Sequence, residues 1–137
     1  MSVIVTDTGF GRDDWSEGYI ALSDVEGLPS ARAVELAGNE DPTPLSNLLA
    51  GIELIRVTFP AFNDGRGFTL GRRLRMMGYT GRLRAAGPIL ADQYAMARRV
   101  GFDEVEIPDD LAERQPQEQW LFRADWRAHD YQSRLRA

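Results

Sequence analysis

The chain has 137 residues, of which 43% are apolar, and a formal net charge of −5 at pH 7. This length suits one domain with one core, and the apolar content is typical of a globular protein rather than a disordered one. The sequence has no cysteine and one histidine, His129. It therefore excludes thiolate metal sites, cysteine nucleophiles and cysteine-held iron–sulfur clusters, and it argues against a histidine-based catalytic triad.

The sequence indicates no transport or membrane segment. The start, MSVIVTDTGF, has no basic region followed by a long apolar one, so it does not indicate a signal peptide. No run approaches the roughly 18 apolar residues that a membrane helix needs. We therefore expect a cytoplasmic protein without membrane contact.

The charges are distributed unevenly, and arginine supplies every basic side chain. Residues 1–55 carry 2 arginines against 10 acidic residues, residues 56–99 carry 9 against 2, and residues 100–137 carry 5 against 9. One interpretation is that the arginines pair with the acidic side chains in the folded protein. The other is an anion site, because the planar guanidinium suits phosphate, sulfate or carboxylate.

In chain order, the first elements are short. SVIVTDTGFGRDDW predicts an N-terminal β-hairpin whose turn is supplied by Gly9 and Gly11. A strand is expected within 18–24, and AVELAG (33–38) is a further short apolar run. Prolines before and a glycine after residues 44–50 predict a short helix there.

Residues 52–107 predict a β-α-β-α-β core. IELIRVTF is a strand, helix 68–77 follows with Leu70, Leu74 and Met77 on one face, and strand 81–87 comes next. A helix begins at Pro88 and ends at Gly101, before the strand FDEVEI. This order predicts parallel strands, neighbours at about 53–59, 82–86 and 103–107, in an α/β fold with an open, mainly parallel sheet. A closed eight-unit barrel would need about 250 residues.

The segment after Pro108 carries many charges together with Trp120, Leu121, Phe122, Trp126 and Tyr131. We interpret it as an aromatic C-terminal tail that docks on the domain or on a second subunit. An open sheet also leaves an edge strand that needs cover, and clustered aromatic residues are common at interfaces. We therefore expect one α/β domain over residues 1–137 that forms a homodimer.

The loop after the strongest strand, residues 60–67, is the main candidate site. Ligands of open parallel sheets bind at the carboxyl ends of the strands, where this loop lies. Asp64-Gly65-Arg66-Gly67 leads into a helix, whose free N–H groups and dipole favour an anion, and Arg66 and Arg72 add side-chain donors. We expect Asp64 to fix the loop or to orient Arg66 or Arg84. The structural alternative is that Asp64 caps the helix or pairs with an arginine, and that the glycines only serve the turn.

Two further candidates lie in the second predicted helix and in the tail. Asp92 and Gln93 are expected near the same end of the sheet, unless they belong to a solvated helix surface with an Asp–Arg pair. His129, on a charged tail, has no evident catalytic partner. Neither a P-loop nor the G-x-G-x-x-G pattern is present.

FPAFNDGRG, GYTG, LRAAG, DQ and GFD, within residues 59–103, resemble the motifs of the DUF934 family of bacterial proteins, described as oxidoreductases associated with sulfite reduction. Gly71-Arg72 departs from the Ala-Arg usual in that family. The resemblance implies a role in sulfur assimilation beside the sulfite reductase haemoprotein. The ligand- or partner-binding residues that we predict are Phe62, Asp64, Gly65, Arg66, Gly67, Arg72, Arg84, Gly87, Asp92 and Gln93.

Three functions remain open at this point. The first is an accessory protein that binds sulfite reductase. The second is an enzyme or sensor for a small oxyanion, including an oxidoreductase that uses a borrowed cofactor of unknown identity. The third is nucleic-acid binding by the arginine-rich middle segment, which the acidic pI of 4.9 and the acidic flanks oppose. The residues favour the accessory protein, no metal site is expected, and catalytic residues are unknown.

Overall fold

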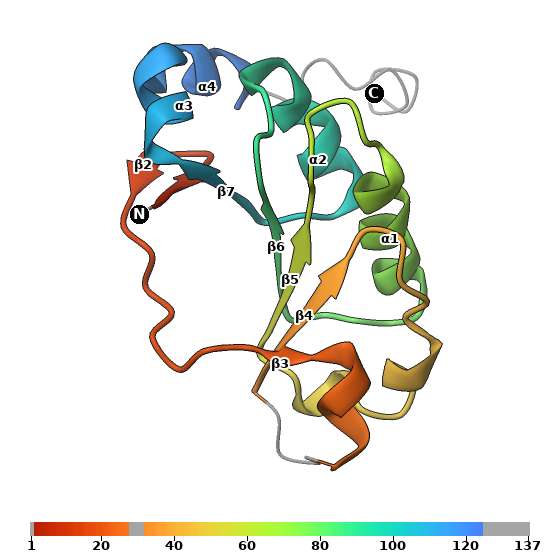
Figure 1. Cartoon of the computed structure of the whole chain (residues 1–137). Coiled ribbons are helices and arrows are strands. Elements are labelled where there is room, and N and C mark those ends of the chain that lie inside the picture. The colour runs from red at the N-terminus through yellow and green to blue at the C-terminus, as the bar shows by residue number, and fades with distance from the viewer. Residues whose placement is uncertain (1, 28–31, 125–137) are drawn as a thin grey trace.

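The computed structural model describes residues 2–27 and 32–124. Its strands form one seven-stranded sheet in the order β2-β1-β7-β6-β5-β4-β3 (Figure 1). The strands are β1 Ser2–Thr6, β2 Gly9–Gly11, β3 Ile20–Ala21, β4 Ala33–Ala37, β5 Leu54–Thr58, β6 Arg82–Ala86 and β7 Glu104–Pro108. The α-helices are α1 Arg66–Met76, α2 Tyr94–Val100, α3 Asp109–Arg114 and α4 Gln117–Arg123, and the 3-10 turns are η1 Leu22–Gly27, η2 Thr43–Leu45, η3 Leu49–Gly51 and η4 Ala91–Gln93.

The five strands from β3 to β7 are parallel, and each pairs with the next one in the chain. The predicted α/β fold and the predicted parallel neighbours at 53–59, 82–86 and 103–107 are therefore confirmed. Because right-handed crossovers that all step in one direction lie on one side of a sheet, α1 and α2 cover the same face. Figure 1 shows both helices on that side of β4, β5 and β6.

The apolar core lies between the sheet and the helices α1 and α2. Leu70 and Leu74 on α1 are buried, as their helical spacing predicts. The ring of Phe59, at the end of β5, contacts the rings of Phe68 and Phe102 at centroid distances of 4.9 and 6.1 Å. This aromatic cluster joins the end of β5 to α1 and to the start of the β7 segment.

The opposite face of the sheet carries charged side chains instead of an apolar layer. In register across four neighbouring strands lie Glu35, Arg56, Arg84 and Glu104. Arg56 binds Glu35 and Glu106 at 2.6 and 2.7 Å, and Arg84 binds Glu104 at 2.5 Å. The segment between β2 and β3 adds carboxylates to this layer. Charge pairing within the fold, the first interpretation of the arginine-rich segment, therefore accounts for these side chains.

Several element boundaries differ from the sequence prediction. The N-terminal hairpin is confirmed, but its turn is Asp7-Thr8, while Gly9, with φ of 119°, and Gly11 lie in β2. The strand expected within 18–24 is only Ile20–Ala21 and passes into η1. The predicted helix 44–50 is replaced by η2 and η3, in a segment where Pro42 and Pro44 provide no N–H donors.

The second predicted helix begins later than Pro88. Leu90 is extended, with φ of −83° and ψ of 152°, and the helical segment starts with η4 before α2. After β7 the chain forms α3 and α4, and Trp120 on α4 is buried against Tyr94, with ring centroids 6.1 Å apart. The indole N–H donates to the carbonyl of Gln115 at 2.9 Å. Trp126, His129 and Tyr131 lie outside the described residues.

Candidate functional site

The β5–α1 loop lies at the carboxyl end of β5, where sequence analysis places the site. The backbone N–H of Phe59 donates to Ala86 at 2.7 Å, so the pairing of β5 with β6 continues to the base of the loop. Gly67, in the first turn of α1, packs on the Phe59 ring so closely that a Cβ would lie 2.3 Å from it. A Cβ on Gly65 would meet no atom within 4 Å. Gly67 therefore permits the contact between helix and strand, whereas Gly65 is not constrained in this way.

Asp64 and Arg66 form one compact unit. Arg66 donates from Nε and Nη2 to the two carboxylate oxygens of Asp64 at 3.0 and 2.7 Å, and its backbone N–H donates to Oδ1 at 3.2 Å. These hydrogen bonds lower the pKa of Asp64 to about 2. Asp64 thus both holds the start of α1 and orients Arg66, whose side chain remains 63% exposed.

Gln93 connects this loop to the β6–α2 segment. Its Nε2 donates to the carbonyl of Phe62 at 2.7 Å, and its Oε1 accepts the N–H of Leu90 at 2.9 Å. The Phe62 side chain itself is 52% exposed. Two predicted site segments that are distant in sequence are therefore held together, with an aromatic ring and a guanidinium presented to solvent.

Gly87, directly after β6, lies against the backbone of Phe59 at the start of the β5–α1 loop. Its φ is 142°, and a Cβ there would lie 2.2 Å from the carbonyl oxygen of Phe59. A side chain at this position is excluded by both conformation and space. Gly87 thus serves the close approach of the two loop-bearing strands.

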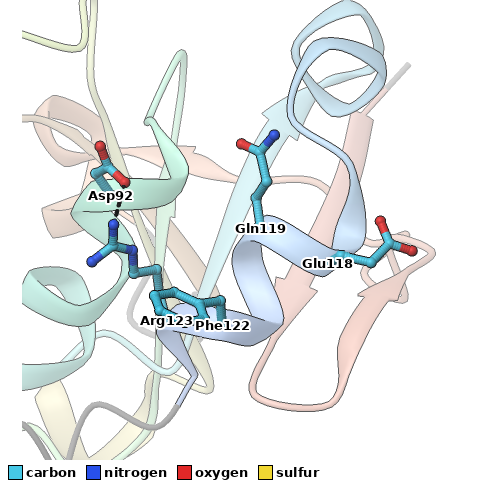
Figure 2. A pocket seen from close by; sticks show the side chains of 5 residues that line it. All are labelled: Asp92, Glu118, Gln119, Phe122 and Arg123. Carbon is cyan, nitrogen blue, oxygen red and sulfur yellow. Dashed lines mark hydrogen bonds and ion pairs between the residues drawn. The ribbon is translucent and has the colours of Figure 1, made fainter.

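Asp92 pairs with α4 and not with the β5–α1 loop. It accepts a hydrogen bond from Arg123 at 2.9 Å. Figure 2 shows this pair among the side chains that line a hollow. The volume of the hollow is about 370 Å³. The hollow is lined by Asp92, Glu118, Gln119, Phe122 and Arg123. The expected Asp–Arg pair on the helix surface is present, although Arg123 comes from the C-terminal segment.

A second hollow, of about 440 Å³, runs along α1 beside the loop that follows β4. It is lined by Gly38, Asn39, Glu40, Arg66, Thr69, Leu70 and Arg73. Arg73 also reaches Asp41 at 3.1 Å. We call this hollow, with these lining residues, the α1 groove. Arg72 is exposed on the same helix and forms no ion pair or hydrogen bond with the described residues.

Sequence reasoning did not include the loop after β4 or Arg73 in the site. Two signals in the sequence could have indicated them. Gly38 directly follows an apolar run that forms a parallel strand, so it lies at the carboxyl end of the sheet. Arg73 lies two helical turns after Arg66, so it lies on the same side of α1.

Arg84 does not belong to this site, and the expectation that Asp64 orients it is wrong. Its side chain is 0% exposed and lies on the sheet face opposite α1 and α2. It donates to Glu104, Asp13, Tyr19 and Glu106 at distances between 2.5 and 3.0 Å. Burial opposes its charge, but Glu104, Tyr19 and Asp13 together outweigh that effect, so the pKa of Arg84 is raised. Strand alternation directs it to the face opposite α1.

The surface around the β5–α1 loop offers the ion-paired guanidinium group of Arg66, the exposed ring of Phe62 and the α1 groove. Among residues 2–27 and 32–124, no three histidine, cysteine or acidic side chains are grouped to hold a metal ion. In the same part of the chain, no helix has the length and apolar character to cross a membrane.

Fold and site together define an α/β protein with an open sheet. At the carboxyl ends of its parallel strands lies an arginine-bearing loop that is held by a hydrogen bond from Gln93. Residues 33–137 match the model of DUF934, a family described as bacterial protein of unknown function, and the chain belongs to this family. No curated protein matches the chain. No solved structure matches it either.

Proposed function

We propose that the protein is a cytoplasmic accessory factor of assimilatory sulfite reduction that binds the sulfite reductase haemoprotein through the surface formed by the β5–α1 loop. The observation that carries this proposal is the clamp from Gln93 to the Phe62 carbonyl. It joins two motif segments into one surface that exposes Phe62 and Arg66. The assignment to sulfite reduction rests on the resemblance of those motifs to the family.

The preference for binding over independent redox chemistry follows from the sequence and from the loop. The chain has no cysteine thiol for redox chemistry and a single histidine for acid–base chemistry. In the loop, Asp64 is engaged by Arg66 and its lowered pKa keeps it ionised, which does not suit a proton donor near neutral pH. An exposed aromatic ring beside an arginine is typical of a protein interface.

Affinity purification of the tagged protein from its native host tests this proposal. The wild-type protein should recover sulfite reductase, and Arg66→Ala should lose it while keeping its fold. Arg114→Ala is the matched control, because Arg114 is 71% exposed on α3 and pairs only with Asp110 among the described residues. If the Arg66→Ala and Asp64→Asn proteins fold normally and support full growth on sulfite, the loop is not the functional site.

The second candidate function is the binding of a small oxyanion, as substrate or as signal. The α1 groove favours it, because Arg66 and Arg73 line the same hollow. Titration calorimetry of the isolated protein with sulfite, sulfate and phosphate tests this function. Saturable binding that Arg73→Gln abolishes would support it, and the absence of heat with all three anions would contradict it. An oxidoreductase with a borrowed cofactor would bind its substrate in the same place.

We also propose a homodimer, supported by exposed apolar side chains near the carboxyl-end loops. Phe62, Met96 and Phe122 are each more than half exposed. The edge strands β2 and β3 have three and two residues, so edge-to-edge pairing is not the expected contact. Light scattering at micromolar concentration should give about twice the chain mass of 15.4 kDa. A mass near 15.4 kDa would contradict the dimer.

A further inference from the structure

Helix α1 has an unusual charge pattern. Its eleven residues, RGFTLGRRLRM, include four arginines and no acidic side chain. One of the four has a structural task, since Arg75 donates to the carbonyls of Gly101, Tyr79 and Gly81 at 2.7–3.0 Å and to Asp103 at 2.9 Å. The other three arginines are exposed. The fold therefore does not require them in the way that it requires Arg75.

These three arginines mark an outward face of α1 beside the α1 groove. The face is formed by Arg66, Thr69, Arg72, Arg73 and Met76. Arg66 and Arg73 line the groove, and Leu70 provides an apolar floor between them. Met76, which is 76% exposed, extends the apolar contact along the helix. Arg66 and Arg73 are seven residues apart, which corresponds to about 10 Å along the helix axis.

The partners that these arginines have within the chain are easily exchanged. The Arg73–Asp41 pair is more than half exposed on both sides, and the Arg66–Asp64 pair is exposed on the arginine side. Exposed pairs of this kind contribute little to stability, so a carboxylate from another molecule can share or replace them. Arg72 has no partner among the described residues. The face can thus accept several carboxylates at little cost.

We propose that the outward face of α1 and the α1 groove bind an acidic segment of a partner protein, with carboxylates spaced by about 10 Å and apolar side chains between them. This inference rests on the proposed docking function and specifies the chemistry of the partner. A polypeptide fits better than a nucleic acid for two reasons. Met76 offers an exposed apolar contact, and the carboxylates of Glu40 and Asp41 beside the groove repel a backbone that carries a charge at every nucleotide more than a peptide whose charges are spaced apart.

Fluorescence anisotropy with a labelled peptide of alternating glutamate and leucine, and with single-stranded DNA of equal formal charge, tests the proposal. The full chain should bind the peptide and should bind the DNA more weakly. Arg72→Gln/Arg73→Gln should weaken peptide binding by roughly three- to tenfold, as expected for two exposed charge pairs. Arg114→Gln, an exposed arginine on α3, should leave it unchanged. The single variant Arg72→Gln keeps the test valid if the double variant misfolds. Its circular dichroism spectrum should match that of the wild type, and its peptide affinity should still be reduced.

Three results would overturn the proposal: no binding of the peptide, equal binding by the double variant and the Arg114→Gln control, or tighter binding of the DNA. The affinity purification described above distinguishes a failure of the acidic-segment proposal from a failure of the proposed accessory role. If the double variant still recovers sulfite reductase as well as the wild type does, the α1 face is not the docking surface and the accessory role stands. If the peptide binds through α1 but no reductase is recovered, the accessory role fails and the acidic-partner surface stands.

Discussion

Gly67 permits the close contact between the start of α1 and the end of β5. A Cβ at this position would clash with the buried ring of Phe59, which is itself in contact with Phe68 and Phe102. Gly65, two residues earlier, has a φ of −82° and open space around it. The two glycines of the motif therefore have different physical roles despite their identical chemistry.

Alanine at these two positions should have opposite consequences. Gly67→Ala should lower the free energy of unfolding by about 1–3 kcal/mol, because the added methyl group overpacks against the Phe59 ring. Gly65→Ala should change it by less than about 0.5 kcal/mol, since alanine adopts this backbone conformation readily. Urea denaturation of both variants measures the difference. Equal stabilities would show that the Phe59 ring can move aside.

The pKa of Asp64 provides a direct probe of the loop. Because this pKa is lowered to about 2 from an ordinary value of 3.8, the pair with Arg66 contributes stability above pH 3.8 and loses it as the pH falls toward 2. Carbon-13 NMR at about pH 3 should find the Asp64 carboxyl ionised in the wild type and mostly protonated in Arg66→Gln. Identical titration curves would mean that Arg66 does not hold Asp64 in solution.

For single residues, the separation in sequence explains which contacts of the site could be predicted. Asp64 and Arg66 are two residues apart, so their pairing follows from any compact turn. The Gln93–Phe62 contact joins two loops, and sequence analysis anticipated only that they share one end of the sheet. The burial of Arg84 could not be predicted. It depends on which face of the sheet Arg84 lies on, and on the acidic segment between β2 and β3 covering that face.

The charged side chains on the sheet face opposite α1 and α2 provide a test at the scale of elements. Arg84→Met would leave the carboxylates of Glu104 and Glu106 without one of their buried partners. We expect it to cost about 3 kcal/mol in the free energy of unfolding, as is usual when one member of a buried charge network is removed. Arg114→Met, at an exposed position on α3, should cost less than about 0.5 kcal/mol. Denaturation midpoints that differ little would show that Arg56 and Arg82 compensate.

Helix α4 has one buried side chain, Trp120. Trp120 is 1% exposed, whereas its neighbour Phe122 is 73% exposed. Trp120→Ala should cost about 3–5 kcal/mol, and Phe122→Ala should be nearly neutral. A single cooperative transition in the wild type, shifted as a whole in Trp120→Ala, would also support the proposal of one domain over residues 1–137. Two separate transitions would contradict it.

For the whole molecule, the α/β class and the parallel core were predictable because residues 52–107 alternate cleanly between strand and helix patterns. The N-terminal third was less predictable. Its strands are short, and prolines limit residues 43–51 to two 3-10 turns. The position of the hairpin beside β7 could not be inferred either, because the contact joins opposite ends of the chain.

That contact has a consequence for the order in which the chain folds. Val5 in β1 pairs with Val105 in β7, whereas Ile55 in β5 pairs with Leu83 in β6. Closing the longer loop costs roughly 1 kcal/mol more entropy, and β7 is among the last strands to leave the ribosome. We expect the first hairpin synthesised to be the last part to dock. Pulsed hydrogen exchange during refolding should protect the amides of β5 and β6 before those of β1, and early protection of β1 would reverse this order.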